Sequence, residues 1–224
     1  DFGRDTFSRI LYGARISLMV GVIAVGIAGT TGTFLGMVSG YTNRRWVDET
    51  IMRGMDILFA FPAILLAIAI MAALGKGVAN AMVAIGLVYI PIFARIGRGA
   101  VLSVRNDEYV TAARALGTPN YVILPRHILP NSMAPLIVEV SLSLAFAILA
   151  EAALSFFGLG TQPPTPSWGR MLSEGRAYFQ QSVWMAIFPG LAIMLSVMGF
   201  NFLGDGLRDA LDPKMKQMLE MQGR

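Results

Sequence analysis

The sequence predicts an all-α transmembrane fold, a helical bundle with about five spans in this chain. Of 224 residues, 55% are hydrophobic and only 14% are charged, and the mean hydropathy is +0.60. A soluble globular domain carries roughly 25% charged residues, so this chain has too few to cover a water-facing surface. Apolar segments that can cross a core of about 30 Å recur along it. None shows the alternation of a β-barrel, so each must be a helix.

Five segments have the length and apolarity of a span. They cover residues 16–41, 57–74, 78–94, 132–158 and 183–204. The transmembrane domain then runs over 16–205, with a central loop at 95–131 and a second loop at 160–182. Residues 1–15 form an extracytoplasmic or interfacial segment and 206–224 a cytoplasmic tail. Pro62, Pro91 and Pro189 lie within spans, where we expect kinks.

Lys and Arg placement predicts the orientation. Twelve basic residues fall in the loop after the first span, the central loop and the tail, against three in the two loops between them. The positive-inside rule therefore places the central loop and the C-terminus in the cytoplasm. Arg4, Arg9 and Arg15 then fall outside, against the rule. We expect a further span upstream, giving six in the native protein, because it would place these first residues on the outer side.

Composition also excludes classes of function. There is no Cys, and His127 is the only histidine, so thiolate and multi-His metal centres are excluded. The net charge of +4 is explained by topology-setting loops, and we expect no nucleic-acid partner. The glycines at 26, 29, 32, 36 and 40 share one face of the first span. Plain close packing is the favoured interpretation, and a moving gate helix the alternative.

The central loop has the marks of a docking element. Asn106 or Asp107 can cap a helix in which Glu108 suits the first turn. The predicted apolar face consists of Tyr109, Ala112, Ala113 and Leu116, with Thr111 and Arg114 pointing away. Gly117 occupies the position of a C′ residue with positive φ, and Pro119 ends the helix. A second segment, bounded by Pro125 and Pro130, follows. Bundle connections usually take about 2–8 residues, so a loop this long predicts docking.

These residues resemble the cytoplasmic "EAA" loop of permease subunits of bacterial ABC importers. The family pattern is Glu-Ala-Ala, three residues, Gly, nine residues, then Ile-x-Leu-Pro. It falls with its spacing intact on Thr111, Ala112, Ala113, Gly117, His127, Leu129 and Pro130, with Thr111 replacing Glu and His127 replacing Ile. "AARALG" with "RHILPN" is the form of the dipeptide, oligopeptide and nickel branch. "GRDTFSRILYGARISL", "MRGMDILFAFP", "EAALSFFGLGTQPPTPSWGRML" and "FNFLGDGLRDALDP" resemble its C-type subunit.

The resemblance implies a type I ABC importer permease in a bacterial or archaeal inner membrane. The expected partners are a homologous B-type permease subunit, two ATPase subunits, an extracytoplasmic substrate-binding protein and membrane lipid. No G-x-x-x-x-G-K-[ST] motif exists in this chain. We therefore expect no cofactor in it, with ATP and Mg²⁺ held by the ATPase subunits, and no enzymatic step. The implied ATPase-coupling residues are Glu108, Tyr109, Ala112, Ala113, Arg114, Leu116, Gly117, His127, Leu129 and Pro130.

Two carboxylates lie within the fourth span, where each costs about 2.5–3.5 kcal/mol unless it faces protein or water. Glu139 and Glu151 are therefore pathway candidates. The alternative is an architectural hydrogen bond, which we favour for Glu151 and weigh equally for Glu139. Arg95 and Arg98 end the third span, where we expect them to snorkel to headgroups.

The polar residues of the remaining loops allow two interpretations each. Asp205, Arg208, Asp209 and Asp212 form either a solvated or an ATPase-facing tail. In the outer loop, Gln162, Trp168 and Arg170 lie either near the pathway mouth and the binding protein or, for Trp168, at the bilayer interface.

Two rival functions stay open on the residues alone. A stand-alone secondary transporter or channel would need ion-coupling carboxylates at broken helices or an inverted repeat, and no convincing repeat is visible. A membrane-embedded enzyme would need clustered catalytic side chains. Among importers, the sequence does not distinguish dipeptide, oligopeptide, nickel-complex and glutathione-like substrates.

Overall fold

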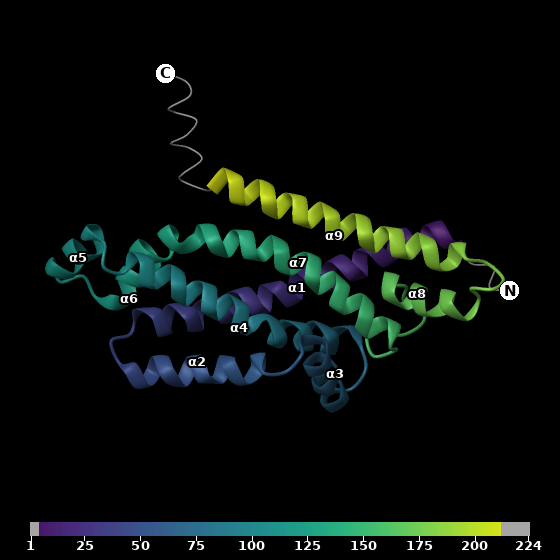
Figure 1. The fold of residues 1–224 in the computed structure, drawn as a ribbon, viewed down its shortest axis with the longest axis horizontal. Helices are drawn as coiled ribbons and strands as arrows, with labels where there is room; N and C mark the ends of the chain where they lie inside the picture. The colour runs from purple at the N-terminus through teal and green to yellow at the C-terminus, as the bar shows by residue number, and fades with distance from the viewer. Residues whose placement is uncertain (1–4, 212–224) are drawn as a thin grey trace, which may run out of the picture.

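The computed structural model describes residues 5–211, and within that range every regular element is helical. The order is α1 (Thr6–Tyr41), α2 (Arg45–Phe59), α3 (Ala63–Leu74), α4 (Val78–Val104), α5 (Glu108–Ala115), α6 (Asn120–Ile123), a π turn (Leu124–Ile128), a 3₁₀ turn (Pro130–Ser132), α7 (Met133–Phe156), α8 (Trp168–Ala177) and α9 (Trp184–Leu211). The long helices α1, α4, α7 and α9 lie along one axis (Figure 1).

Four helices are long and apolar enough to cross a membrane, or five if the bent pair α2–α3 is one span. The expected count of about five therefore holds, but a continuous helix over 57–74 is wrong. The chain bends by 93° between α2 and α3, and Pro62 is the residue before α3. Proline has no N–H and restricts the residue before it, so Pro62 favours a helix boundary at this position. Helices α4 and α9 do continue through Pro91 and Pro189.

Three helices extend beyond the expected spans. Helix α1 begins at Thr6, because the Asp5 carboxylate accepts hydrogen bonds from the backbone N–H groups of Phe7 (3.1 Å) and Ser8 (3.0 Å). Much of the expected extracytoplasmic segment is thus a helical extension. Helix α4 runs on to Val104 and α9 to Leu211.

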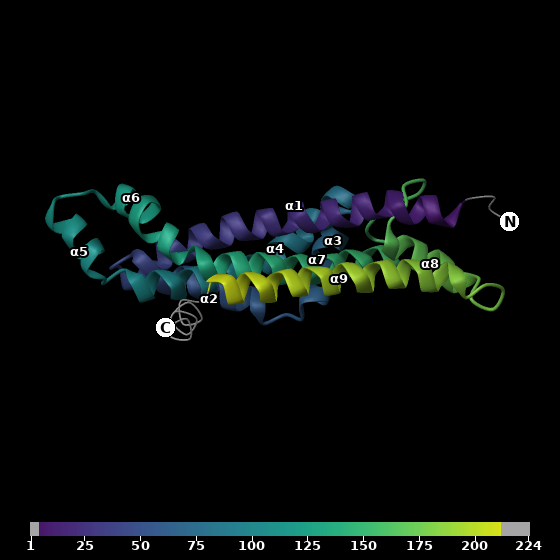
Figure 2. The same ribbon diagram turned by 90° about the horizontal axis from the view of Figure 1, so that it is seen from above.

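The two ends of the bundle differ in what they carry. Helices α5 and α6 lie beyond one end in both views, and α8 lies at the other, beside the start of α1 (Figures 1 and 2). The loops expected in the cytoplasm thus share the α5–α6 end, as the charge pattern predicted.

Helices α1 and α4 pack through glycines. A Cβ added at any of three glycines of α1 would lie 2.3–2.8 Å from a backbone carbonyl oxygen of α4, closer than real Cβ atoms come. Only glycine allows this approach, as in small-residue interfaces of membrane helices. The pairs are Gly32 with Ile90, Gly36 with Ala94, and Gly40 with Arg98.

The other two glycines of the predicted face do not share this contact. A Cβ at Gly29 would meet only the Phe93 ring, at 3.6 Å, and one at Gly26 would meet nothing within 4 Å. The packing interpretation is therefore confirmed for the last three of the five glycines.

Candidate functional site

The central loop folds into a compact element, here called the knuckle (residues 107–132), whose first half is α5. Asp107 holds the N-cap position in extended conformation, although its side chain makes no capping hydrogen bond. At the other end Gly117 has φ +77°. The Gly117 N–H donates to the Arg114 carbonyl (2.9 Å) and the Thr118 N–H to the Ala113 carbonyl (3.1 Å). This is a Schellman motif, so the predicted stop at Gly117 is confirmed.

The second half of the knuckle is a continuous helical segment leading into α7. The sequence predicted that Pro125 bounds this segment, and that prediction is wrong. Pro125 lies inside the π turn. Because Pro125 has no N–H, the α-helical ladder cannot continue regularly. The turn widens instead, and the Leu129 N–H donates to the Leu124 carbonyl at 2.9 Å.

The knuckle shares a small core with the ends of α1 and α4. Six side chains are buried there: Met37, Val101, Val110, Ala113, Ile123 and Ile128. The predicted apolar face of α5 is thus partly wrong, because of its four residues only Ala113 is buried. Val110, which the prediction missed, forms the buried pair with it. The spacing i, i+3 was visible in the sequence, but which stripe of so short a helix meets the bundle was not.

The remaining predicted residues of this stretch are exposed to solvent. Glu108, Ala112 and Arg114 are exposed, and Leu116 is 85% exposed. Tyr121 of α6 is 79% exposed. Large apolar side chains so exposed beyond the end of a bundle mark an interaction surface when they gather.

The second half of the motif connects α5 to α7. The His127 side chain is half-buried, and its carbonyl accepts from the Asn131 side-chain amide at 2.7 Å. The Asn131 side chain also forms a hydrogen bond with the phenol of Tyr109. Burial and the nearby Asp107 carboxylate raise the pKa of Tyr109, although this hydrogen bond acts to lower it. Leu129 packs on the knuckle core and Pro130 opens the 3₁₀ turn.

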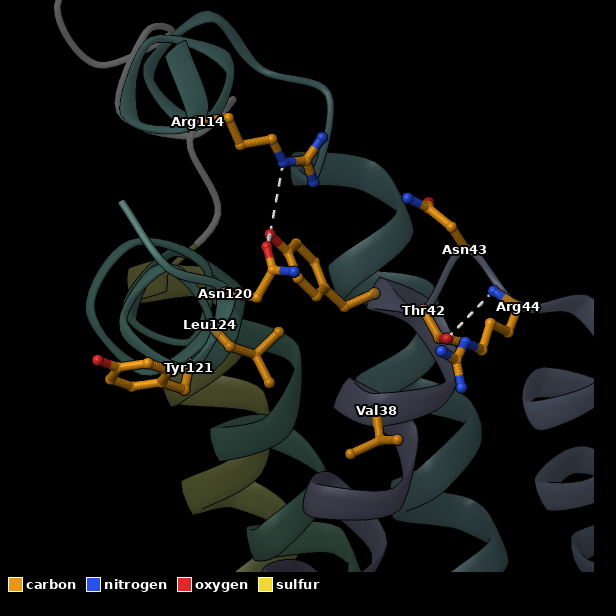
Figure 3. Close-up of a pocket in the computed structure, with 9 residues that line it drawn as sticks. Val38, Thr42, Asn43, Arg44, Arg114, Asn120, Tyr121 and Leu124 are labelled. Atoms are coloured by element: carbon orange, nitrogen blue, oxygen red, sulfur yellow. Dashed lines mark hydrogen bonds between the residues drawn. The ribbon is translucent and has the colours of Figure 1, made fainter. Parts of the chain in front are cut away.

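A groove of about 540 Å³ lies between the end of α1 and the knuckle (Figure 3). Tyr41 of α1 stands in it and donates its hydroxyl hydrogen to Asn120 Oδ1 at 2.8 Å. Arg114 Nε donates to the Tyr41 hydroxyl at 3.4 Å, and the guanidinium lies 5.1 Å from the ring centroid. Arg114 therefore leans back onto α1.

Arg95 and Arg98 lie inside α4, and α2 brings a carboxylate within reach of each one. Their snorkelling to headgroups stays a prediction. Arg98 binds Asp48 through two hydrogen bonds, Nε to Oδ1 at 2.7 Å and Nη2 to Oδ2 at 2.6 Å. The Ser39 hydroxyl donates to the same carboxylate. Arg95 bonds Asp56 at 2.6 Å. An adjacent carboxylate holds a bidentate guanidinium more firmly than distant headgroups can.

Glu151 is the centre of a buried network. It is 1% exposed, and its oxygens accept from the hydroxyls of Ser17 (2.9 Å), Ser155 (2.7 Å) and Thr161 (3.3 Å). The bonds join α1, α7 and the start of the outer loop, as the architectural interpretation requires. A pathway role for Glu151 stays a prediction.

Glu139 is half-buried and accepts from the Ser143 hydroxyl of its own helix at 2.8 Å. It lines a groove of about 320 Å³ together with Asp205 and Arg208. Both belong to α9, as does Asp209, so the expected tail begins within a helix; Asp212 lies outside the described residues. Because Glu139 lines a groove, it remains a pathway candidate.

The outer loop folds back on the bundle through α8. Trp168 is 4% exposed and its Nε1 donates to the Ile10 carbonyl at 3.0 Å. The bilayer-anchor interpretation of Trp168 is therefore wrong, because α8 packs on α1 and takes the indole out of the surface. Gln162 donates to the carbonyls of Gly158 (3.0 Å) and Gly160 (3.1 Å), which closes the turn before α8.

Glu174 ties α8 to the outer end of α1. Its carboxylate binds Arg9 at 2.8 Å and Arg170 at 3.0 Å. Burial raises the pKa of the Glu174 carboxyl, but the two guanidinium groups outweigh it and hold the pKa below its usual value.

Comparison with known proteins places this geometry in one family. Residues 32–217 match the family model described as "Binding-protein-dependent transport system inner membrane component". The chain is 56% identical over 216 residues to the dipeptide transport system permease protein DppC of Alkalihalophilus pseudofirmus, covering 96% of this chain and 71% of that protein. It is 51% identical over 214 residues to the glutathione transport system permease protein GsiD of Pectobacterium atrosepticum, with the same coverage.

Solved structures show the same fold at low identity. An inward-facing structure of the MetNI methionine ABC transporter matches with a TM-score of 0.75 and 17% identity, covering 91% of this chain and 96% of that one. An amino acid ABC transporter with histidines matches with a TM-score of 0.69 and 15% identity, over 94% and 100%. With the family match across most of its length, this chain belongs to the binding-protein-dependent inner membrane components and is a permease subunit of an ABC importer.

Proposed function

We propose that this chain forms part of the translocation pathway for di- or oligopeptides or a related small solute such as glutathione. Relatives at about half identity, named for dipeptide and glutathione transport, support this class of substrate. In the proposed complex a B-type permease subunit completes the pathway in a bacterial inner membrane. Two ATPase subunits, which hold ATP and Mg²⁺, dock on the cytoplasmic face, and a binding protein delivers the substrate outside.

The observation that carries the proposal is the construction of the knuckle. Its inner face is fixed to the ends of α1 and α4 by a shared core, while its outer face presents Leu116 to solvent. A force on that face is transmitted to both helices, because close-packed interiors shift as units and do not deform continuously.

The packing inside the bundle extends this coupling to the other end. Close contact at Gly32, Gly36 and Gly40 makes α1 and α4 move together. Helix α1 in turn reaches the outer loop directly through the Arg9–Glu174 contact and, by way of Glu151 of α7, through the Ser17–Glu151 and Thr161–Glu151 bonds. ATPase closure at the knuckle would thus reposition the outer loop, as alternating access requires.

Co-purification of ATPase subunits with the membrane chain tests the proposal. Leu116→Asp places a charge at the exposed tip, whereas Leu116→Met keeps an apolar side chain and serves as the matched control. We expect ATPase subunits to be lost with Asp and retained with Met. Ala113→Arg and Gly117→Pro, which disrupt the knuckle core and its Schellman stop, should also lose them. Equal recovery with Leu116→Asp and wild type would refute docking at this tip.

A further inference from the structure

The groove of Figure 3 holds positive charge without a counter-charge. Arg44 and Arg114 both line it, and neither lies within 4.0 Å of a carboxylate oxygen in residues 5–211. The other polar side chains of the lining are neutral: Tyr41, Thr42, Asn43, Asn120 and Tyr121. In the same part of the chain five arginines do have carboxylate partners: Arg9, Arg45, Arg95, Arg98 and Arg170.

One of the two cations is held in place before any ligand arrives. Arg114 stacks on the Tyr41 ring and uses only its Nε for the Tyr41 hydroxyl, which leaves its terminal nitrogens free. Tyr41 is itself fixed by Asn120. A planar guanidinium with free donors is suited to binding phosphate oxygens in pairs.

The charged groove continues into an apolar one. Tyr121 and Leu124 line both, and the second groove has about 810 Å³ and no charged side chain in its lining. Along α1 it reaches from Met37 to Val22, about 22 Å at 1.5 Å per residue. Half of a bilayer core is about 15 Å thick, so the groove is longer than one leaflet is deep. Phe34, 64% exposed, stands in it.

We propose that the two grooves together bind one anionic phospholipid, its phosphate held by Arg44 and Arg114 and an acyl chain lying along α1. A cationic pocket joined to an uncharged channel fits an amphiphile with an anionic head. Its position fits too, because the arginine-rich end of the bundle is the predicted cytoplasmic side, where anionic lipids attract basic residues. The proposal does not depend on the transported substrate.

Native mass spectrometry of the full chain in detergent, with equimolar phosphatidylglycerol and phosphatidylcholine, tests the site. We expect wild type to retain phosphatidylglycerol in preference to phosphatidylcholine. Arg44→Gln and Arg114→Gln should each lower phosphatidylglycerol binding about fivefold, because each variant removes one basic residue that attracts the anionic lipid. Arg45→Gln is the matched control, because Arg45 is the next residue, pairs with Glu49 and lies outside the lining. Arg45→Gln should bind phosphatidylglycerol as strongly as wild type does.

Other outcomes identify other occupants and overturn the proposal. Equal retention of both lipids, or equal loss with Arg45→Gln and Arg114→Gln, shows that the groove does not select a lipid. Displacement of phosphatidylglycerol by millimolar inorganic phosphate shows a site for free phosphate. If Phe34→Ala releases a co-purifying permease subunit but retains the lipid, the apolar groove is a protein interface. If the Arg44 and Arg114 variants lose ATPase subunits but bind lipid as wild type does, the groove contacts the ATPase.

Discussion

Replacing Gly36 by alanine should separate α1 from α4. The added Cβ would lie 2.3 Å from the Ala94 carbonyl oxygen and 2.8 Å from the Arg98 nitrogen, both backbone atoms. An ordinary carbon–oxygen contact is about 3.3–3.6 Å, so the helices must part by about 1 Å. Overpacking typically costs about 1–3 kcal/mol. We expect the upper part of that range, about 2–3 kcal/mol, because no flexible side chain can move aside.

Gly26→Ala is the matched control for this change. It lies on the same helix, and its added Cβ would meet nothing within 4 Å. Both substitutions gain about 1 kcal/mol of helix propensity, which cancels when the variants are compared. For a chain of this size about 2–4 °C corresponds to each kcal/mol, so Gly36→Ala should melt about 4–12 °C below Gly26→Ala in detergent. Equal melting temperatures would refute the view that α1 and α4 pack through backbone contact.

Three further predictions concern the polar contacts. Glu151→Leu should destabilise the protein by about 2 kcal/mol or more, since buried hydroxyls lose their acceptor, and Glu151→Gln by less; thermal melting measures both, and equal effects would contradict the network. Glu174 has a lowered pKa, so its stabilisation of α8 is present above its unfolded pKa of about 4.3 and is lost as pH falls through the lower folded value. The protection factors of the α8 amides, which are exchange rates corrected for the intrinsic pH dependence, should therefore fall in acid for wild type and stay flat for Glu174→Gln; parallel pH profiles would contradict this. Asp48→Asn should free Arg98 and loosen α2 by about 1–3 kcal/mol, seen as faster proteolysis of α2 than in Arg45→Gln, which serves as control.

The knuckle shows how far local sequence rules reach. The stop at Gly117 follows from short-range chemistry, because a positive-φ position depends on neighbouring residues. The start near Asp107 and the two-part form were also predicted, although the Asp107 side chain makes no capping bond. The choice of Val110 over Leu116 as the buried residue depends on where the ends of α1 and α4 lie. Helix α5 has only two turns, so its own pattern allows more than one inward stripe.

The sequence alone determined the membrane class, the approximate spans and the end at which the basic loops gather, because each follows from composition and length. Only the tertiary structure decided the partners of the charged groups within the bundle. Arg98 finds Asp48 fifty residues away, and Ser17 reaches Glu151 across 134 positions. Such pairs are set by how helices pack side by side, which no local pattern encodes. The same physical reason places Trp168 in the contact between α8 and α1 and not at the bilayer interface, which was one of its two predicted positions.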